Sequence, residues 1–284
     1  MKQSERQLMK RDKERDMRVY KRDDMIQKAR FSLSVQEQRC VLYAISKIKP
    51  TDTVFQEYQF DIKDFYSICG LADQSYTKLK AILRKLSDRS WWAIIDDKGT
   101  ESVLRWFSTV HTNEKSGVVT IKFHEDMMPF LLNLTSQNAF FTSYNLINIL
   151  PMKSQYSPRL YELLKSYQKN NVEWFFELEK LKHLLECGGV KSYENFKDFR
   201  RFVLQPAVDE INKYTDLKIA YETEKEGRKV ARITFYMLEK DSQQKFEAKQ
   251  TAIRELDGQL SVDDVNALIE TEKDSVKGKF FRGE

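Results

Sequence analysis

The feature that most constrains this chain is a helix–turn–helix pattern that occurs once in each half. In the second half, leucines at three-residue spacing over Leu178–Leu184 predict a short helix, which we expect to end at a glycine C-cap in Cys187-Gly188. Ser192 is then expected to cap a longer helix. The apolar residues of that helix recur mostly every four positions, which places them on one side: Phe196, Phe199, Val203, Ala207 and Ile211.

Two alternating apolar segments follow this helix and predict a pair of strands. They are Leu217–Tyr221 and Val230–Tyr236, joined by the charged turn Glu224–Lys229, in which Gly227 permits a positive φ. A helix that exposes cations, followed by a ribbon with a basic tip, is typical of a winged helix–turn–helix. The helix would enter a major groove and the ribbon would hold the DNA backbone beside it.

The same residues also fit a helix whose basic side simply faces water. Lys197 and Arg201 lie opposite the apolar side, but Glu194 and Asp198 reduce the positive charge there. Repetition of the whole pattern favours DNA binding over this alternative, because two tandem helix–turn–helix units are hard to explain as plain scaffolding.

The first half repeats the series between residues 62 and 95. A short helix over Ile62–Ile68 is expected to end at Cys69-Gly70, and Ser75 is expected to cap a longer helix. The apolar side of that helix is formed by Leu79, Ile82, Leu83 and Leu86. Strands Trp91–Ile95 and Leu104–Thr109, joined by the turn Asp96–Gly99, form a second candidate wing. The two copies suggest duplication of one module.

Other elements are predicted from caps and alternation. Ser34 and Glu37 form a capping box, which begins a helix through Lys49, and Pro158 begins a helix through Lys169. Another capping box at Ser261 predicts a helix to Lys277. Further apolar patterns predict strands over Tyr58–Asp61, Val118–Phe123, Phe140–Ile149 and Trp174–Glu177, and a helix over Glu125–Leu134.

We therefore expect an α+β, helix-rich fold with two tandem winged-helix domains, for which 284 residues give enough length. A charged flexible arm is predicted over residues 1–24. The first winged-helix domain is expected over residues 25–151 and the second over 152–240. The remaining residues, 241–284, are expected to form a polar, partly helical C-terminal tail.

Composition argues against catalysis and against a metal site. The three cysteines are far apart, and the three histidines (His111, His124 and His183) never lie within four residues of one another. The paired histidines of a metal-dependent rolling-circle nuclease are therefore missing. There is no long apolar segment or signal peptide. We expect a cytoplasmic protein that is not an enzyme, has no cofactor and does not contact a membrane. The net charge of +5 does not by itself predict nonspecific DNA binding.

Several ordered motifs carry a family likeness. The segment Lys28–Ser34 with Glu37-Gln38-Arg39 resembles the opening motif of theta-type, iteron-binding plasmid replication initiators, the family of the F-plasmid initiator. The second half is similar to the same family at four places, which are Ser157–Leu164, Asp198–Arg201, Glu210–Asn212 and Gly227-Arg228.

The resemblance implies a protein that binds directly repeated origin sequences, called iterons, in double-stranded DNA. Monomers of such initiators activate the origin with the host replication initiator and helicase-loading proteins. Homodimers, formed mainly through the first domain, bind an operator inverted repeat and repress the initiator's own gene. The second domain would be the main iteron-reading domain. Two other readings remain open, a winged-helix transcriptional regulator and a protein-interaction scaffold without a DNA ligand.

The candidate DNA-binding residues lie on two helices and one wing. The resemblance places Arg200 and Arg201 at the DNA, whereas Asn195 and Lys197 depart from the F-type pattern. The wing lysines and arginine are expected to hold phosphates, and three cations of the first domain take the positions that correspond to the recognition helix. The full set is Lys78, Lys80, Arg84, Tyr193, Asn195, Lys197, Arg200, Arg201, Lys225, Arg228 and Lys229.

Overall fold

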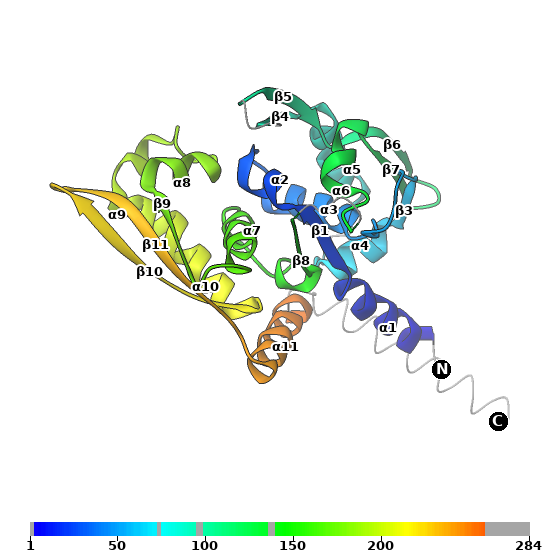
Figure 1. The fold of residues 1–284 in the computed structure, drawn as a ribbon. Coiled ribbons are helices and arrows are strands. Elements are labelled where there is room, and N and C mark those ends of the chain that lie inside the picture. Colours follow the sequence, from blue (N-terminus) through cyan, green and yellow to red (C-terminus); the bar gives the residue numbers. More distant parts are fainter. Residues whose placement is uncertain (1–2, 73–74, 95–98, 136–139, 259–284) are drawn as a thin grey trace.

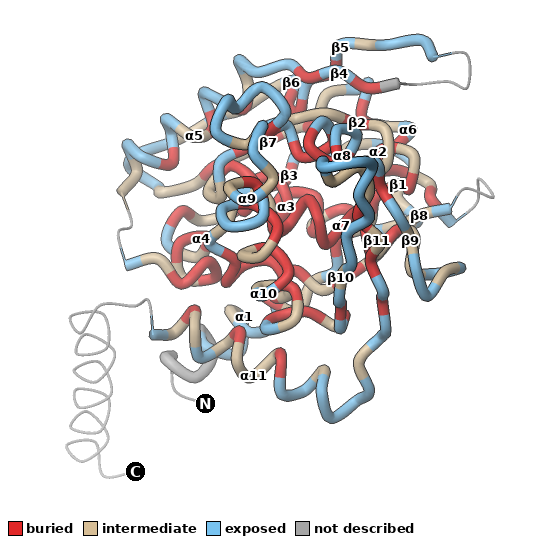
Figure 2. Tube along the Cα trace, turned by 90° about the vertical axis from the view of Figure 1, so that its left-hand side faces the viewer, coloured by how far each residue is buried: buried red, intermediate tan, exposed pale blue. Residues whose placement is uncertain are grey.

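The computed structural model describes residues 3–258 except 73–74, 95–98 and 136–139. Figure 1 shows two groups of helices and strands, one on each side of helix α7 (Ser157–Gln168). Buried residues follow α3 (Val35–Ile45), α7 and α10 (Gln205–Tyr214), whereas most of β10 (Leu217–Glu226) is exposed (Figure 2). The apolar core is continuous from the first group through α7 to the second.

The second group has the element order of a winged helix. After α7 come strand β9 (Glu173–Glu177), helix α8 (Leu178–Leu184), a long helical segment, and the hairpin of β10 and β11 (Lys229–Glu239). The three strands form an antiparallel sheet in the order β10-β11-β9. Both wing strands are longer than the sequence predicted, because pairing continues to the Gly227 turn.

The first group repeats this topology with an additional hairpin. Its elements are α3, β3 (Tyr58–Asp61), α4 (Ile62–Ile68), α5 (Tyr76–Asp88), β4 (Ser90–Ile94), β5 (Glu101–Arg105), β6 (Phe107–Asn113) and β7 (Val118–Phe123). One sheet has the order β3-β7-β6, which corresponds strand for strand to β9-β11-β10. The strand predictions for β3 and β7 are confirmed.

The position of the first wing was predicted wrongly. Strands β4 and β5 do form a hairpin, but it lies in a separate sheet in which β4 also pairs with β2 (Ala29–Arg30). Residues 95–98, where part of the predicted turn falls, lie outside the described residues. The hairpin that corresponds to β10-β11 is β6-β7, because β7 pairs with β3 as β11 pairs with β9. Alternation within each strand could not reveal which strand pairs with which.

The predicted helix caps have mixed outcomes. Ser34 and Glu37 form the capping box, and Ser75 accepts a hydrogen bond from the N–H of Lys78. The predicted cap at Ser192 is wrong, because Ser192 lies inside the short 3₁₀ helix η3 (Lys191–Glu194). Asn195 instead caps α9 (Phe196–Phe199), since its extended backbone separates η3 from α9 and its side chain accepts from the N–H of Lys197.

The turn after the short helix also differs between the two copies. After α4, Gly70 has φ +65°, and the N–H groups of Gly70 and Leu71 bond the carbonyls of Ser67 and Tyr66, which is a Schellman motif. After α8 the left-handed position is taken by Glu186, at φ 52°. The predicted glycine C-cap at Gly188 is therefore wrong, because the left-handed position after α8 lies two residues earlier, at Glu186.

A proline changes the path of the recognition helix. Between α9 and α10 the backbone forms a π-helical turn, η4 (Arg200–Leu204), in which the N–H of Gln205 bonds the carbonyl of Arg200. Pro206 follows directly and has no N–H to continue the ordinary ladder, so a wide turn accommodates it. The predicted apolar side is confirmed for Phe199, Val203, Ala207 and Ile211, all fully buried.

The described part of the N-terminal arm is more ordered than expected, and the described part of the C-terminal tail is helical, as predicted in part. The predicted flexible arm contains α1 (Gln3–Arg15) and β1 (Arg18–Arg22), and β1 pairs with β8 (Phe141–Asn145). Arg15 is buried, donates to the carbonyls of Ser67 and Ile68, and forms an ion pair with Asp257 at 2.9 Å. Asp257 belongs to α11 (Ser242–Gly258), so the described part of the polar tail forms a helix. That helix packs mainly against α10 and the 3₁₀ helix η2 (Leu146–Asn148), and Asp257 links it to α1.

Several helices and strands are shorter than predicted, or begin elsewhere. Helix α3 ends at Ile45 and tighter turns lead to Pro50. The segment after β7 forms the 3₁₀ helix η1 (Glu125–Met127) and α6 (Met128–Leu131), while β8 is followed by η2 (Leu146–Asn148). The remaining element, α2 (Asp23–Lys28), follows β1 directly. The helix predicted to begin at Ser261 lies outside the described residues.

Helix α7 joins the two domains through buried polar contacts. Lys21 of β1 forms an ion pair with Glu162 of α7 at 2.6 Å, with both side chains only 3% exposed, and Tyr144 donates to the same carboxylate. Burial raises the pKa of Tyr144 well above its ordinary value, with the Glu162 charge adding to the effect. Arg159 of α7 donates to the carbonyl of Ala29 at 2.6 Å. The predicted boundary at 151/152 therefore precedes a helix that packs on both domains.

Candidate nucleic-acid interface

Three predicted cations of the second recognition helix are exposed: Lys197, Arg200 and Arg201. Arg200 is held in place by β10, because its Nε donates to the hydroxyl of Tyr221 at 3.0 Å and that hydroxyl donates to Gln205 at 3.0 Å. A guanidinium carries five N–H donors, so four of those of Arg200 remain for other acceptors. These two hydrogen bonds fix the side chain of Arg200 at the surface of the domain.

An exposed aromatic ring lies beside the second arginine. The guanidinium of Arg201 is 5.0 Å from the ring centroid of Phe202, and Phe202 is 50% exposed. The sequence prediction missed Phe202 as a surface residue of this site. Pro206, four positions later, was the available signal, because a proline inside a predicted helix indicates a change in helical path.

Two of the predicted site residues, Asn195 and Tyr193, also make contacts within the protein. Asn195 accepts a hydrogen bond from the N–H of Lys197 at 2.9 Å, which leaves its amide NH₂ for an outside partner. Tyr193 is half-buried and packs edge-on against Tyr156, with the ring centroids 6.3 Å apart. Both residues therefore position the start of the recognition helix.

The second wing carries its three predicted cations on exposed positions. Lys225 follows a register shift after Glu224, and Arg228 and Lys229 lie at the turn. Gly227 has φ +61°, with open space where a Cβ would lie. This tip extends away from the body of the molecule in Figure 1.

In the first domain, the three predicted cations lie on the exposed side of α5. Lys80 lies 5.8 Å from the ring centroid of Tyr76, and Arg84, whose side chain is 84% exposed, is 3.7 Å from Asp88. Lys78 is exposed on the same helix. Tyr76 donates to Thr112 of β6 at 3.0 Å, which fixes α5 against the hairpin.

The first wing has a cation that the sequence prediction missed. Lys115 is exposed in the turn between β6 and β7, where Asn113 accepts hydrogen bonds from the N–H groups of Lys115 and Ser116. Gly117 closes the turn at φ +69°. An asparagine and a glycine between two alternating segments were the signal for this hairpin.

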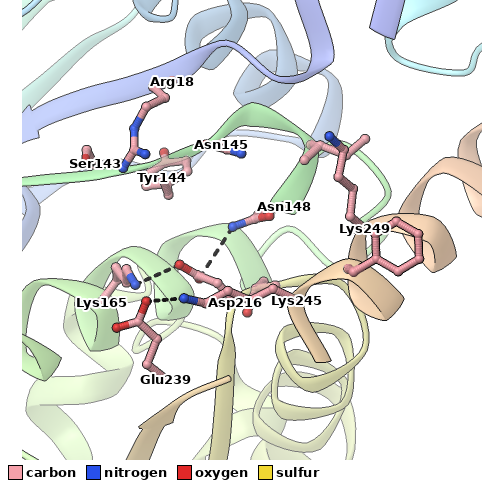
Figure 3. A pocket seen from close by; sticks show the side chains of 13 residues that line it. Arg18, Ser143, Tyr144, Asn145, Asn148, Lys165, Asp216, Glu239, Lys245 and Lys249 are labelled. Atoms are coloured by element: carbon pink, nitrogen blue, oxygen red, sulfur yellow. Dashed lines mark hydrogen bonds and ion pairs between the residues drawn. The ribbon is translucent and has the colours of Figure 1, made fainter. Parts of the chain in front are cut away.

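A cavity of about 330 Å³ lies at the junction of the two domains and α11 (Figure 3). Most of its charged groups are paired, with Lys165 at 2.8 Å from Asp216, Lys249 at 2.6 Å from Asp16, and Lys245 at 2.5 Å from Glu239. These pairs neutralise the cavity wall. The cavity therefore contributes little positive charge toward a nucleic acid.

The described residues include no group of three or more His, Cys, Asp or Glu side chains arranged to hold a metal ion. Cys69 and Cys187 are buried, and burial raises the pKa of each thiol to about 12. Within the same residues, no helix has the length and apolar character needed to span a membrane.

Two sequence-family models match the chain, in the order of its two domains. "Initiator Replication protein, WH1" matches residues 18–165, and "Initiator Rep protein, WH2" matches residues 177–237. The chain belongs to the Initiator Replication protein family. This membership confirms the resemblance found in the sequence and the two winged-helix domains.

Individual relatives of this initiator family agree. The PI protein of Escherichia coli is 28% identical over 146 residues, 47% of each chain. A "Replication initiation protein" of Escherichia coli is 24% identical over 221 residues, 73% of this chain and 65% of that protein. The chain thus spans about half to two thirds of the length of these relatives. A crystal structure of the Pi initiator protein in complex with iteron DNA has the same fold, with a TM-score of 0.67 and 21% identity over 80% of this chain and 99% of that one.

Proposed function

We propose that this chain is a plasmid replication initiator that binds iterons in double-stranded DNA as a monomer to start theta replication. The observation that carries the proposal is the repetition of one unit in each domain of an initiator-family chain. The unit is a helix with exposed cations packed against a hairpin with at least one exposed lysine at its tip. The related Pi initiator protein was crystallised with iteron DNA, which supports this ligand class.

The second domain supplies the main base-reading surface in this proposal. Arg200 and Arg201 contact guanine edges or adjacent phosphates, and Phe202 packs against the sugar or base surface beside them. Lys197, Asn195 and Tyr193 position the start of the helix at the DNA backbone. The wing cations Lys225, Arg228 and Lys229 bind phosphates. In the first domain, the cations that contact DNA are Lys78, Lys80 and Arg84 on α5 and Lys115 on the β6-β7 wing.

The test is a titration of the purified chain against its own plasmid's repeat-bearing DNA and a scrambled fragment. Arg201→Ala should weaken iteron binding by about 1–3 kcal/mol and reduce discrimination between the two fragments. Arg254→Ala removes an exposed arginine from α11 and serves as the control. Unchanged iteron affinity in Arg201→Ala would refute the assignment of this helix.

We propose further that dimers form through the first domain and repress the initiator's own promoter. The supporting feature is the outer strand β5, which is an edge of the sheet β2-β4-β5. Beside it Trp92 and Val103 face each other across the hairpin, 50% and 46% exposed. A second copy of the chain would cover these side chains.

Sedimentation of Trp92→Arg measures this dimer. The variant is expected to remain monomeric at concentrations where the parent chain dimerises, and to bind iterons normally. Operator binding should weaken in parallel. A dimer that persists in Trp92→Arg would place the contact elsewhere.

The protein in this proposal acts in the cytoplasm without catalysis or a cofactor, together with the host replication initiator and helicase-loading proteins. Supplied in trans, it should sustain a plasmid that carries only the origin fragment. Repression of the promoter without maintenance of that fragment would favour a transcriptional regulator instead.

A further inference from the structure

The outer face of the second sheet carries exposed apolar side chains. Phe175 of β9 and Tyr236 and Leu238 of β11 are 51%, 38% and 59% exposed. Strand register places them on one side, because Phe175 pairs with Thr234, two residues before Tyr236. The opposite side holds the buried residues Ile233 and Phe235 and packs against the helices of the domain.

Carboxylates surround these apolar side chains. Glu173 and Glu177 lie on β9, and Glu222 and Glu224 lie on β10, all exposed and all in register with outward residues of β11. Two cations share this side, Arg232 on β11 and Lys218 on β10. We call this surface, strands β9, β11 and β10 on the side away from α10, the acidic face.

Arg232 does not make the net charge of the acidic face positive. Its guanidinium lies 3.0 Å from Glu177 and 3.3 Å from Glu224, and 4.4 Å from the ring centroid of Phe175. Glu222 accepts a hydrogen bond from the hydroxyl of Tyr236 at 3.2 Å. Neither Glu222 nor Glu173 lies in an ion pair with a cation of the described residues, so no paired cation offsets these two carboxylates.

The corresponding face of the first domain has a different composition. Across β3, β7 and β6 its central row is Gln59, Thr120 and His111. The one carboxylate at its end, Asp61, accepts a hydrogen bond from the N–H of Lys63 and caps α4. The same topology therefore forms without an acidic, aromatic outer face, which means that the fold does not require one.

DNA is an unsuitable ligand for this surface, because carboxylates repel phosphates. Exposed aromatic rings among like charges are typical of protein interfaces, where aromatic residues are enriched and charge complementarity selects the partner. We propose that the acidic face docks a partner protein through a segment in which lysine or arginine side chains flank apolar ones. The site leaves the recognition helix free, so partner and DNA bind together.

The experiment uses the full chain and a pair of charge-matched variants. Glu173→Lys with Glu222→Lys changes the acidic face, and Glu125→Lys with Glu247→Lys makes the same charge change on exposed positions of η1 and α11. The direct probe is a labelled synthetic peptide of alternating arginine and leucine, with a glutamate–leucine peptide as control. The second readout is maintenance of an origin plasmid in trans, which rests on the proposed function.

The acidic-face variant should bind the arginine–leucine peptide at least about tenfold more weakly than the matched variant. It should also fail to maintain the plasmid, while its iteron affinity equals that of the matched variant. Phe175→Ser with Leu238→Ser should give the same pattern without a charge change.

Three outcomes would overturn the proposal. Equal peptide binding and equal plasmid maintenance in both variants would show that the face has no partner. Reduced iteron affinity would assign the face to DNA binding or folding. Loss of the dimer in sedimentation would make the occupant a second copy of the chain. A parent chain that binds the peptide but does not distinguish iterons from scrambled DNA would refute the proposed function alone.

Discussion

The two winged-helix domains share one topology and differ in the turn between the two helices of each helix–turn–helix unit. Both turns use the left-handed backbone region, yet one is occupied by Gly70 and the other by Glu186. At Gly70 an added Cβ would lie 2.4 Å from the carbonyl oxygen of Leu256 in α11. The first domain therefore needs glycine because α11 packs on its turn. In the second domain a glutamate is tolerated, which shows that the turn itself does not demand glycine.

The largest expected loss of stability comes from the buried ion pair between Lys21 and Glu162 of α7, the helix that packs on both domains. Glu162→Gln leaves Lys21 buried without a carboxylate, so unfolding in urea should show a loss of about 3–5 kcal/mol. Lys249→Gln removes a partly exposed ion pair and should cost less than about 1 kcal/mol. Because α7 packs on both domains, spectroscopic probes in the two domains should show the same change in unfolding midpoint. A shift confined to one domain would mean that they fold independently.

The next effect tests why glycine is required in the first turn. Gly70→Ala should lower the free energy of unfolding by about 2–4 kcal/mol, from the left-handed backbone and the contact with Leu256. Gly227→Ala has a similar φ and open space, so it isolates the backbone cost of about 1–2 kcal/mol. Equal losses in the two variants would show that α11 moves away without cost.

The reverse substitution in the second domain should stabilise the chain. Glu186→Gly relieves the left-handed strain but increases the freedom of the unfolded chain, so we expect a gain of at most about 1 kcal/mol in urea unfolding. Lys180→Gly within α8 is the control and should destabilise by about 1 kcal/mol. A loss of stability in Glu186→Gly would show that the glutamate side chain makes a stabilising contact.

The smallest effect compares the two wings. Lys229→Ala and Lys115→Ala should each weaken binding to iteron and scrambled DNA alike, and reduce the slope of log affinity against log salt by about 0.9. The measurement is a salt titration of each variant. An unchanged slope for Lys115→Ala alone would mean that only the second domain holds DNA with its wing.

Local signals predicted most of the elements of this fold. Capping at Ser34 and Ser75, the alternation of β3 and β7, and the buried side of the recognition helix all follow from neighbouring residues. The repeated helix–turn–helix pattern predicted the winged-helix pair, and the family motifs implied the same fold. Local signals failed at Ser192 and Gly188, because several residues there could cap or end a helix, and packing selects among them.

The candidate site was predicted in part. The exposed positions of Lys197, Arg200, Arg201 and the second wing follow from helical and turn patterns. Phe202 and Lys115 were missed. The place of Lys115 on the first wing depends on which hairpin pairs with β3, which no local pattern reveals. The residues that contact DNA stay predictions until the titrations are made.

The sequence by itself determined the kinds of element, their order and the duplication, because caps, periodicity and turn residues act over a few neighbouring positions. Tertiary structure decided the strand pairing that makes β6-β7 the first wing, and the packing of both chain ends. Arg15 and Asp257 are far apart in the chain, and Arg15 also donates to the carbonyls of Ser67 and Ile68 at the end of α4. A long-range contact of this kind cannot be predicted from the pattern of either segment, because each segment alone is simply charged and polar.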